Sequence, residues 1–114
     1  MKHKNILIKN GFLTNSKNTS KEDVLISNGK ISEIGSLTDT KADYIIDASN
    51  KYVVSGIIDP QVHFRDPGLT HKEDLNTGSM SAAAGGITTF FEMPNTNPST
   101  ITIEKLNEKY QTAS

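Results

Sequence analysis

Residues with metal-binding chemistry stand at alternate positions between Gly56 and Gly68. Asp59, Gln61 and His63 follow an apolar run and are separated from one another by one residue. In an extended chain, side chains two residues apart point to the same side, so these three would form one polar row. Imidazole is the commonest metal ligand, and a nearby carboxylate can orient it. The row predicts half of a metal site; the alternative is a hydrogen-bonded histidine in a loop beside a capping aspartate.

Arg65 and Asn95 offer a second chemistry, the binding of an anion. Arg65 precedes the turn Asp66-Pro67-Gly68, which would aim its guanidinium back over the end of the preceding strand. The planar guanidinium suits a carboxylate, so Arg65 is a candidate substrate anchor. Asn95 stands at the equivalent position of the next strand–helix unit and offers an amide donor. The alternatives are a surface arginine paired with Asp66 and an ordinary turn asparagine.

A first strand–helix unit is predicted to position this polar row. The nearly continuous apolar run Val53–Ile58 is typical of a strand that is buried on both faces of a parallel sheet. A loop from Asp59 to about Thr70 follows. Thr70 and Glu73 spell a capping box, which predicts a helix over roughly residues 71–84 that ends at Gly85-Gly86. Small residues on the inward face of this helix would let it lie close to the sheet.

A second unit of the same kind follows. Ile87–Met93 is β-branched and aromatic and predicts another buried strand, within which Glu92 either faces a cavity or pairs with a neighbour. The turn cluster Pro94–Pro98 leads to a helix over about residues 102–113, with Ile103, Leu106 and Tyr110 on one face. Polar residues past the carboxyl ends of both strands predict the start of a parallel α/β fold with its site at that edge.

Residues 1–52 predict a small, sandwich-like β domain of about five short strands. Asn-Gly pairs at 10–11 and 28–29 predict turns, and the second pair predicts a type I′ hairpin. None of these side chains suggests chemistry, and His3 is interpreted as a solvated terminal residue.

Composition narrows the function classes. The 12 basic and 13 acidic residues leave a formal charge of -1 and form no basic run, which argues against nucleic acid and anionic membranes as partners. No cysteine is present, so any metal must be held by histidine, carboxylate or amide groups. The amino-terminal apolar run, Ile6–Ile8, is too short for a signal peptide or a membrane span, so we expect a cytoplasmic protein.

The stretch from Gly56 to Thr100 resembles the opening of a dihydroorotase of the amidohydrolase superfamily, of the larger bacterial type. The resemblance is carried by FRDPG, THKED, AAAGGITT and MPNTNP. It implies an incomplete metal-dependent hydrolase (β/α)8 barrel, in which residues 1–52 belong to the small β domain and residues 53–114 form the first two βα units. Allantoinases and hydantoinases share the fold but typically lack this combination of arginine turn and PNTNP loop.

The resemblance also implies an activity and roles for single residues. In the family, hydroxide activated by one or two zinc ions attacks the ring amide carbonyl of dihydroorotate and gives N-carbamoyl-aspartate, within pyrimidine biosynthesis. His63 matches the second histidine of the family's His-x-His metal motif, and Arg65 and Asn95 match the residues that grip the substrate carboxylate. Gln61 occupies the position of the first histidine and is a poorer zinc ligand.

Several alternatives remain open at this stage. The family's bridging ligand, two later histidines and acid/base aspartate are absent from this sequence, so we expect an inactive fragment of a homo-oligomeric enzyme. The first alternative is a catalytically silent dihydroorotase-like subunit that scaffolds aspartate transcarbamoylase, which Gln61 favours. The second is a hydantoinase or allantoinase, against which the pair of Arg65 and Asn95 argues.

Overall fold

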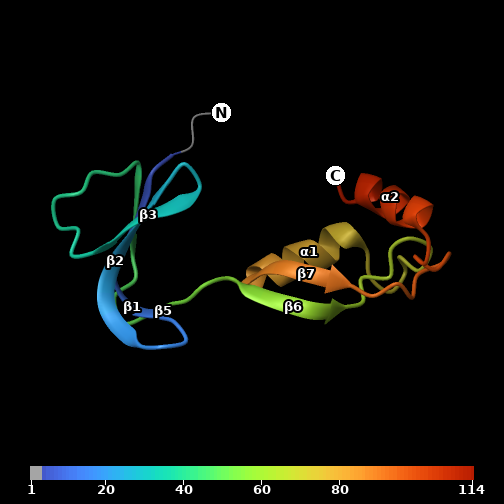
Figure 1. The fold of residues 1–114 in the computed structure, drawn as a ribbon, viewed down its shortest axis with the longest axis horizontal. Helices are drawn as coiled ribbons and strands as arrows, with labels where there is room; N and C mark the ends of the chain where they lie inside the picture. Colours follow the sequence, from blue (N-terminus) through green and yellow to red (C-terminus); the bar gives the residue numbers. More distant parts are fainter. Residues whose placement is uncertain (1–3) are drawn as a thin grey trace. The chain divides into compact units, whose positions relative to one another are not determined.

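The computed structural model describes residues 4–114, so His3 lies outside the described residues. The chain divides into two compact units between Ser55 and Gly56. The first unit consists of strands, and the second contains two strands and two helices (Figure 1).

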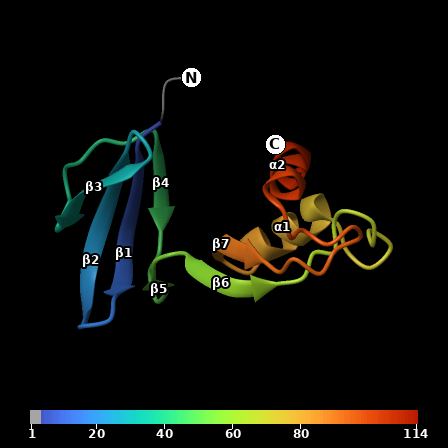
Figure 2. The same cartoon turned by 45° about the vertical axis from the view of Figure 1, so that its right-hand side comes forward.

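The first unit is one mixed sheet in the order β3-β2-β1-β4, with β5 paired to β1 (Figure 2). Strands β1 and β2 form a long antiparallel pair, while β4 and β5 run parallel to β1. Its buried apolar residues are Leu7, Val24, Leu37 and Ala48. The predicted sandwich-like domain thus consists, in the described residues, of a single sheet. The strands are β1 (Ile6–Thr14), β2 (Thr19–Ser27), β3 (Lys30–Gly35), β4 (Tyr44–Asp47) and β5 (Tyr52–Val53).

The two Asn-Gly pairs of this unit behave differently. Asn28 and Gly29 have φ of 53° and 73° and join β2 to β3, so the predicted type I′ hairpin is confirmed. The turn predicted at Asn10 is wrong, because β1 continues through it with a bulge. The backbone N–H of Asn10 donates to the carboxylate of Asp23 at 2.8 Å, which holds the extra residue within the strand.

The second unit contains the two predicted strand–helix units. Strands β6 and β7 pair in parallel. The first strand begins at Ile57 and not at Val53, because Tyr52 and Val53 pair with β1 in the other unit. It also ends later than predicted, so Asp59 and Gln61 lie on the strand. The elements are β6 (Ile57–Val62), α1 (Leu75–Ala84), β7 (Ile87–Glu92) and α2 (Ile103–Thr112).

Helix α1 starts later than the sequence predicts. The capping box at Thr70 is not used, because two aspartates bind the free N–H groups of the first turn. Asp74 accepts from the backbone of Thr77 at 2.7 Å, and Asp66 accepts from the backbone of Leu75 at 3.3 Å. The predicted end at Gly85 is confirmed.

Helix α1 lies close against the strand pair, as its small residues predict. An added Cβ at Gly78 would come within 2.6 Å of the Phe64 ring. Phe64 also meets Phe90 edge to face at 4.7 Å between ring centroids. Val62, Phe64 and Leu75 form the buried apolar cluster of this unit.

Other apolar surfaces of the second unit are open. Phe91 is 59% exposed and Ile58 is also 59% exposed, so the strands are not buried on both faces within this chain. Ile103, Leu106 and Tyr110, predicted on one face of α2, are all exposed in this chain, although Leu106 and Tyr110 line a cavity beside β7. Lys109 is the buried residue of this helix. Within residues 4–114, no helix is long and apolar enough to cross a membrane.

Candidate functional site

The loops that follow β6 and β7 stay paired beyond the ends of the strands. The β6–α1 loop comprises residues 63–74, and the β7–α2 loop comprises residues 93–102. The backbone of Met93 donates to Val62 O at 2.9 Å, and the backbone of Asn97 donates to Pro67 O at 3.0 Å. Because these hydrogen bonds bracket His63, Arg65 and Asn95, the three predicted site residues lie at one edge.

Gln61 and His63 share the open side of this edge. Both are exposed, while the intervening Val62 and the following Phe64 are buried. Asp59 is only partly exposed, and the pairing of β6 with β7 shifts register between Asp59 and Val62. Its carboxylate accepts the backbone N–H of Gln61 at 3.0 Å.

His63 and Asn95 are joined by a side-chain hydrogen bond. His63 Nδ1 lies 3.0 Å from Asn95 Oδ1. An amide oxygen only accepts, so Nδ1 is the donor in this arrangement, and in that tautomer Nε2 has a lone pair for a metal. The Nδ2 amide group of Asn95 is left to donate elsewhere.

Asn95 is fixed by the structure of its own loop. The next residue, Thr96, is buried, and its hydroxyl lies 2.8 Å from Pro98 O and 3.0 Å from the hydroxyl of Thr100. The backbone N–H of Thr100 also donates to Pro94 O at 2.9 Å. These bonds hold the amide of Asn95 at the edge before any ligand arrives.

Arg65 adopts an unusual backbone conformation that turns it toward the neighbouring loop. Its φ is 66°, in the left-handed region that non-glycine residues seldom occupy. The guanidinium reaches the backbone oxygen of Asn95 at 3.5 Å, a long and weak hydrogen bond. Among the described residues Arg65 forms no ion pair, and the carboxylate of Asp66 caps α1 instead. Most of the five N–H donors of Arg65 are therefore available to a ligand.

The metal-binding capacity of this edge is partial. The described part of the chain holds no group of three histidine, cysteine or acidic residues that could bind a metal ion. His63 Nε2 and the amide oxygen of Gln61 are two donors, whereas a catalytic zinc site uses three protein ligands. These residues fit half of such a site.

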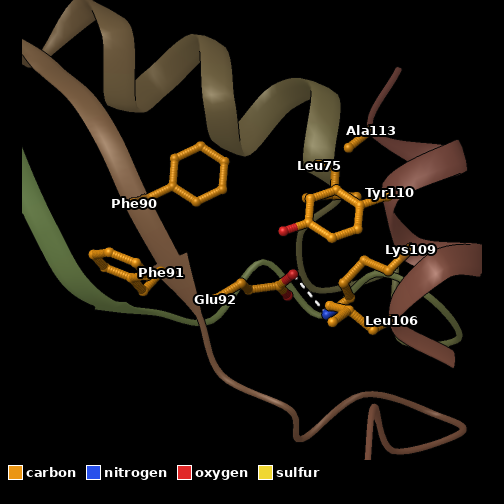
Figure 3. Close-up of a pocket in the computed structure, with 8 residues that line it drawn as sticks. All are labelled: Leu75, Phe90, Phe91, Glu92, Leu106, Lys109, Tyr110 and Ala113. Atoms are coloured by element: carbon orange, nitrogen blue, oxygen red, sulfur yellow. Dashed lines mark ion pairs between the residues drawn. The ribbon is translucent and has the colours of Figure 1, made fainter. Parts of the chain in front are cut away.

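Of the two alternatives predicted for Glu92, a cavity or a neighbouring partner, the structure shows a buried ion pair whose partner the sequence did not identify. Lys109 Nζ lies 2.7 Å from Glu92 Oε2, beside a cavity of about 250 Å³ (Figure 3). Neither carboxylate oxygen has a hydrogen bond of good geometry. A charged residue within an apolar strand was the available signal, but the partner on α2 could not be read from the helical period.

Comparison with known proteins shows the family to which this chain belongs. A family model described as "Dihydro-orotase-like" matches residues 50–113, more than half of the chain. The chain belongs to the dihydroorotase-like family. It is 47% identical over 105 residues to a dihydroorotase from Streptococcus pyogenes serotype M3, and 44% identical over 110 residues to one from Streptococcus pneumoniae serotype 4. These matches cover 90% and 95% of this chain, but 25% and 26% of the two relatives.

A solved structure has a similar fold over the region that this chain covers. The L-hydantoinase (dihydropyrimidinase) from Arthrobacter aurescens matches with a TM-score of 0.89 and 38% sequence identity. The match covers 95% of the dihydroorotase-like chain and 24% of the hydantoinase chain. The predicted fold class is confirmed: a small β domain is followed by the first two βα units of an amidohydrolase barrel. The chain spans about a quarter of the length of these relatives.

Proposed function

We propose that this chain is the amino-terminal part of a zinc-dependent dihydroorotase that interconverts dihydroorotate and N-carbamoyl-aspartate in pyrimidine biosynthesis. The observation that carries the proposal is the placement of Arg65 and Asn95 on two paired loops, with unused donors at one edge. The similarity to dihydroorotases at 44–47% identity supports it. A cytoplasmic homo-oligomer is part of the same proposal.

The roles of the residues follow from their donors. Arg65 binds the substrate carboxylate through its guanidinium, and Asn95 donates an amide N–H to the same group. Together they orient the ring so that its scissile amide lies toward His63. His63 holds zinc through Nε2 and Gln61 contributes at most a weak amide oxygen, with the remaining ligands supplied from elsewhere in the whole protein. When bound, zinc polarises the amide carbonyl and supplies hydroxide at neutral pH.

The 114-residue chain alone is proposed to be inactive. Its described residues offer two donors of a metal site, and its strands expose apolar side chains such as Ile58 and Phe91. Zinc-dependent turnover of dihydroorotate by the isolated chain would contradict this part of the proposal.

A second candidate function is favoured by Gln61. If the amide cannot support metal binding, the whole protein would be a catalytically silent dihydroorotase-like subunit that scaffolds aspartate transcarbamoylase. The likeness to hydantoinase structures favours a third candidate, a hydantoinase that acts on rings without a carboxylate.

One assay separates the three candidates. The whole protein, supplied with zinc, is tested with dihydroorotate, dihydrouracil and hydantoin. Turnover with a strong preference for dihydroorotate is expected. Preference for hydantoin would overturn the proposal in favour of a hydantoinase. No turnover, together with a stable complex with aspartate transcarbamoylase in size-exclusion chromatography, would indicate the silent subunit.

A further inference from the structure

The backbones of the two site loops come into close contact at Gly68. Its φ is +86°, and a Cβ at this position would overlap the carbonyl oxygen of Asn97. The same added atom would lie 2.7 Å from the Asn97 carbonyl carbon and 2.8 Å from its Cβ. Because the obstacle is mainly backbone, no rotation of a side chain would make room.

A backbone hydrogen bond closes the same contact. The N–H of Asn97 donates to Pro67 O at 3.0 Å, one residue before Gly68. We call Pro67, Gly68 and Asn97 the loop seam. It holds one loop against the other with no side chain between them.

Short, hydrogen-bonded segments connect the loop seam to both residues of the proposed carboxylate clamp, Arg65 and Asn95. Arg65 lies three residues before Gly68, and its carbonyl oxygen accepts the N–H of Leu69 at 3.0 Å. Asn95 lies two residues before Asn97, in the loop that Thr96 braces. A displacement at Gly68 would therefore change the separation of Arg65 and Asn95.

We propose that Gly68 is a positioning residue, which sets the separation of Arg65 and Asn95 and so their fit to a ring carboxylate. The inference rests on the proposed function. Any side chain at Gly68 would push the two loops apart. The guanidinium of Arg65 and the amide of Asn95 could then no longer bind the same carboxylate.

Gly86 supplies a matched control for the backbone cost. Its φ is +83°, nearly the same as that of Gly68, but a Cβ there would meet nothing within 4 Å. An alanine at either position incurs a similar backbone penalty. Only the alanine at position 68 overlaps the opposite loop. A difference in KM between the two variants therefore measures the effect of the loop seam.

The experiment compares the whole wild-type protein with Gly68→Ala and Gly86→Ala. Gly68→Ala is expected to raise KM for dihydroorotate about tenfold or more, with a smaller change in kcat, because a charge-assisted hydrogen bond in substrate binding is lost. Gly86→Ala is expected to keep KM within about twofold of the wild type. An unchanged KM in Gly68→Ala, or an equal rise in both variants, would overturn the proposal.

Two further measurements separate failure of this proposal from failure of the proposed function. If the wild type does not turn over dihydroorotate, the proposed function fails, and the seam is tested by the crystal structure of Gly68→Ala. Displaced loops support the seam, and superimposable loops refute it. If Gly68→Ala does not fold, hydrogen exchange at the Asn97 amide of the wild type decides: slow exchange supports the seam and fast exchange contradicts it.

Discussion

The two units of this chain use their polar side chains in opposite ways. In the first unit, Asp23 accepts backbone N–H groups from Asn10 at 2.8 Å and Leu37 at 3.0 Å. The hydrogen bond from Asn10 holds the pKa of Asp23 below its ordinary value, against the effect of burial. Asp47 is bound by Ser49, whose hydroxyl is the main cause that lowers the pKa of Asp47 to about 2. These carboxylates are saturated by local donors.

In the second unit, the polar side chains at the strand ends keep unused capacity. Nε2 of His63 and the amide N–H groups of Asn95 are available to a ligand. Arg65 makes one long hydrogen bond to the neighbouring loop, so its other N–H groups are also available. A carboxylate whose acceptor sites are all used stabilises the fold, whereas polar groups that are held in place but keep unused donors or acceptors indicate a binding site.

The buried ion pair offers the strongest test of this contrast, because the second unit also contains a structural charge. Lys109→Met would leave the carboxylate of Glu92 buried without a counter-ion and is expected to destabilise the unit by about 3–5 kcal/mol. Hydrogen exchange in β7 and α2 of the whole protein measures this as a loss of protection.

A surface pair on the same helix serves as the control. Lys105 binds Glu108 at 2.7 Å, but their side chains are 37% and 59% exposed. Lys105→Met is expected to change stability by less than about 1 kcal/mol. Equal effects of the two substitutions would show that the buried pair is not structural.

A histidine at position 61 tests whether the open edge binds metal. Gln61→His should raise the zinc affinity of the whole protein about tenfold or more, since imidazole replaces a weak amide ligand beside His63. Equilibrium dialysis with zinc measures the change, and Pro60→His, on the adjacent exposed position, is the control. Zinc binding that is identical in wild type and Gln61→His would argue that His63 is not a ligand.

Apart from the control substitutions, the smallest change is expected for a substitution in the first unit. Asp23→Asn replaces one acceptor oxygen by a donor that faces the N–H of Asn10 or Leu37, so it should destabilise the sheet by about 1–2 kcal/mol near pH 7. Because the pKa of Asp23 is lowered in the folded state, its contribution is present above the unfolded pKa of about 4 and is lost as pH falls below it.

The pH dependence gives this prediction a clear control. The stability difference between wild type and Asp23→Asn, measured by hydrogen exchange in β1 and β2, should shrink as pH is lowered from 7 to 3. Asp39→Asn, at an exposed position, should leave stability unchanged at both values. A difference that is independent of pH would mean that the charge of Asp23 does not matter.

Locally determined features could be predicted from the sequence. The hairpin at Asn28 needs only two residues with positive φ, and the end of α1 needs only its glycines. The parallel α/β arrangement and the edge that carries His63, Arg65 and Asn95 followed from the order of strands, turns and polar residues, whereas the barrel was implied by the family resemblance.

Features that depend on distant partners could not be predicted. The hydrogen bond from Asn10 to Asp23 stabilises a β-bulge where the sequence predicted a turn. Asp66 caps α1 from nine residues before Leu75. The burial of Lys109 depends on Glu92 in another element, so the apolar period of α2 did not indicate it. The loop seam at Gly68 likewise requires the course of a second loop.

The most direct test of the central claim is the kcat/KM for dihydroorotate of the whole protein and of its Arg65→Met variant. Removal of the guanidinium leaves the substrate carboxylate unpaired, so a loss of about 2–5 kcal/mol in transition-state stabilisation is expected, at least about thirtyfold in kcat/KM. Lys72→Met, an exposed basic residue on the same loop, should leave the constant unchanged. An unchanged kcat/KM for Arg65→Met would contradict the assignment of this edge as a carboxylate clamp.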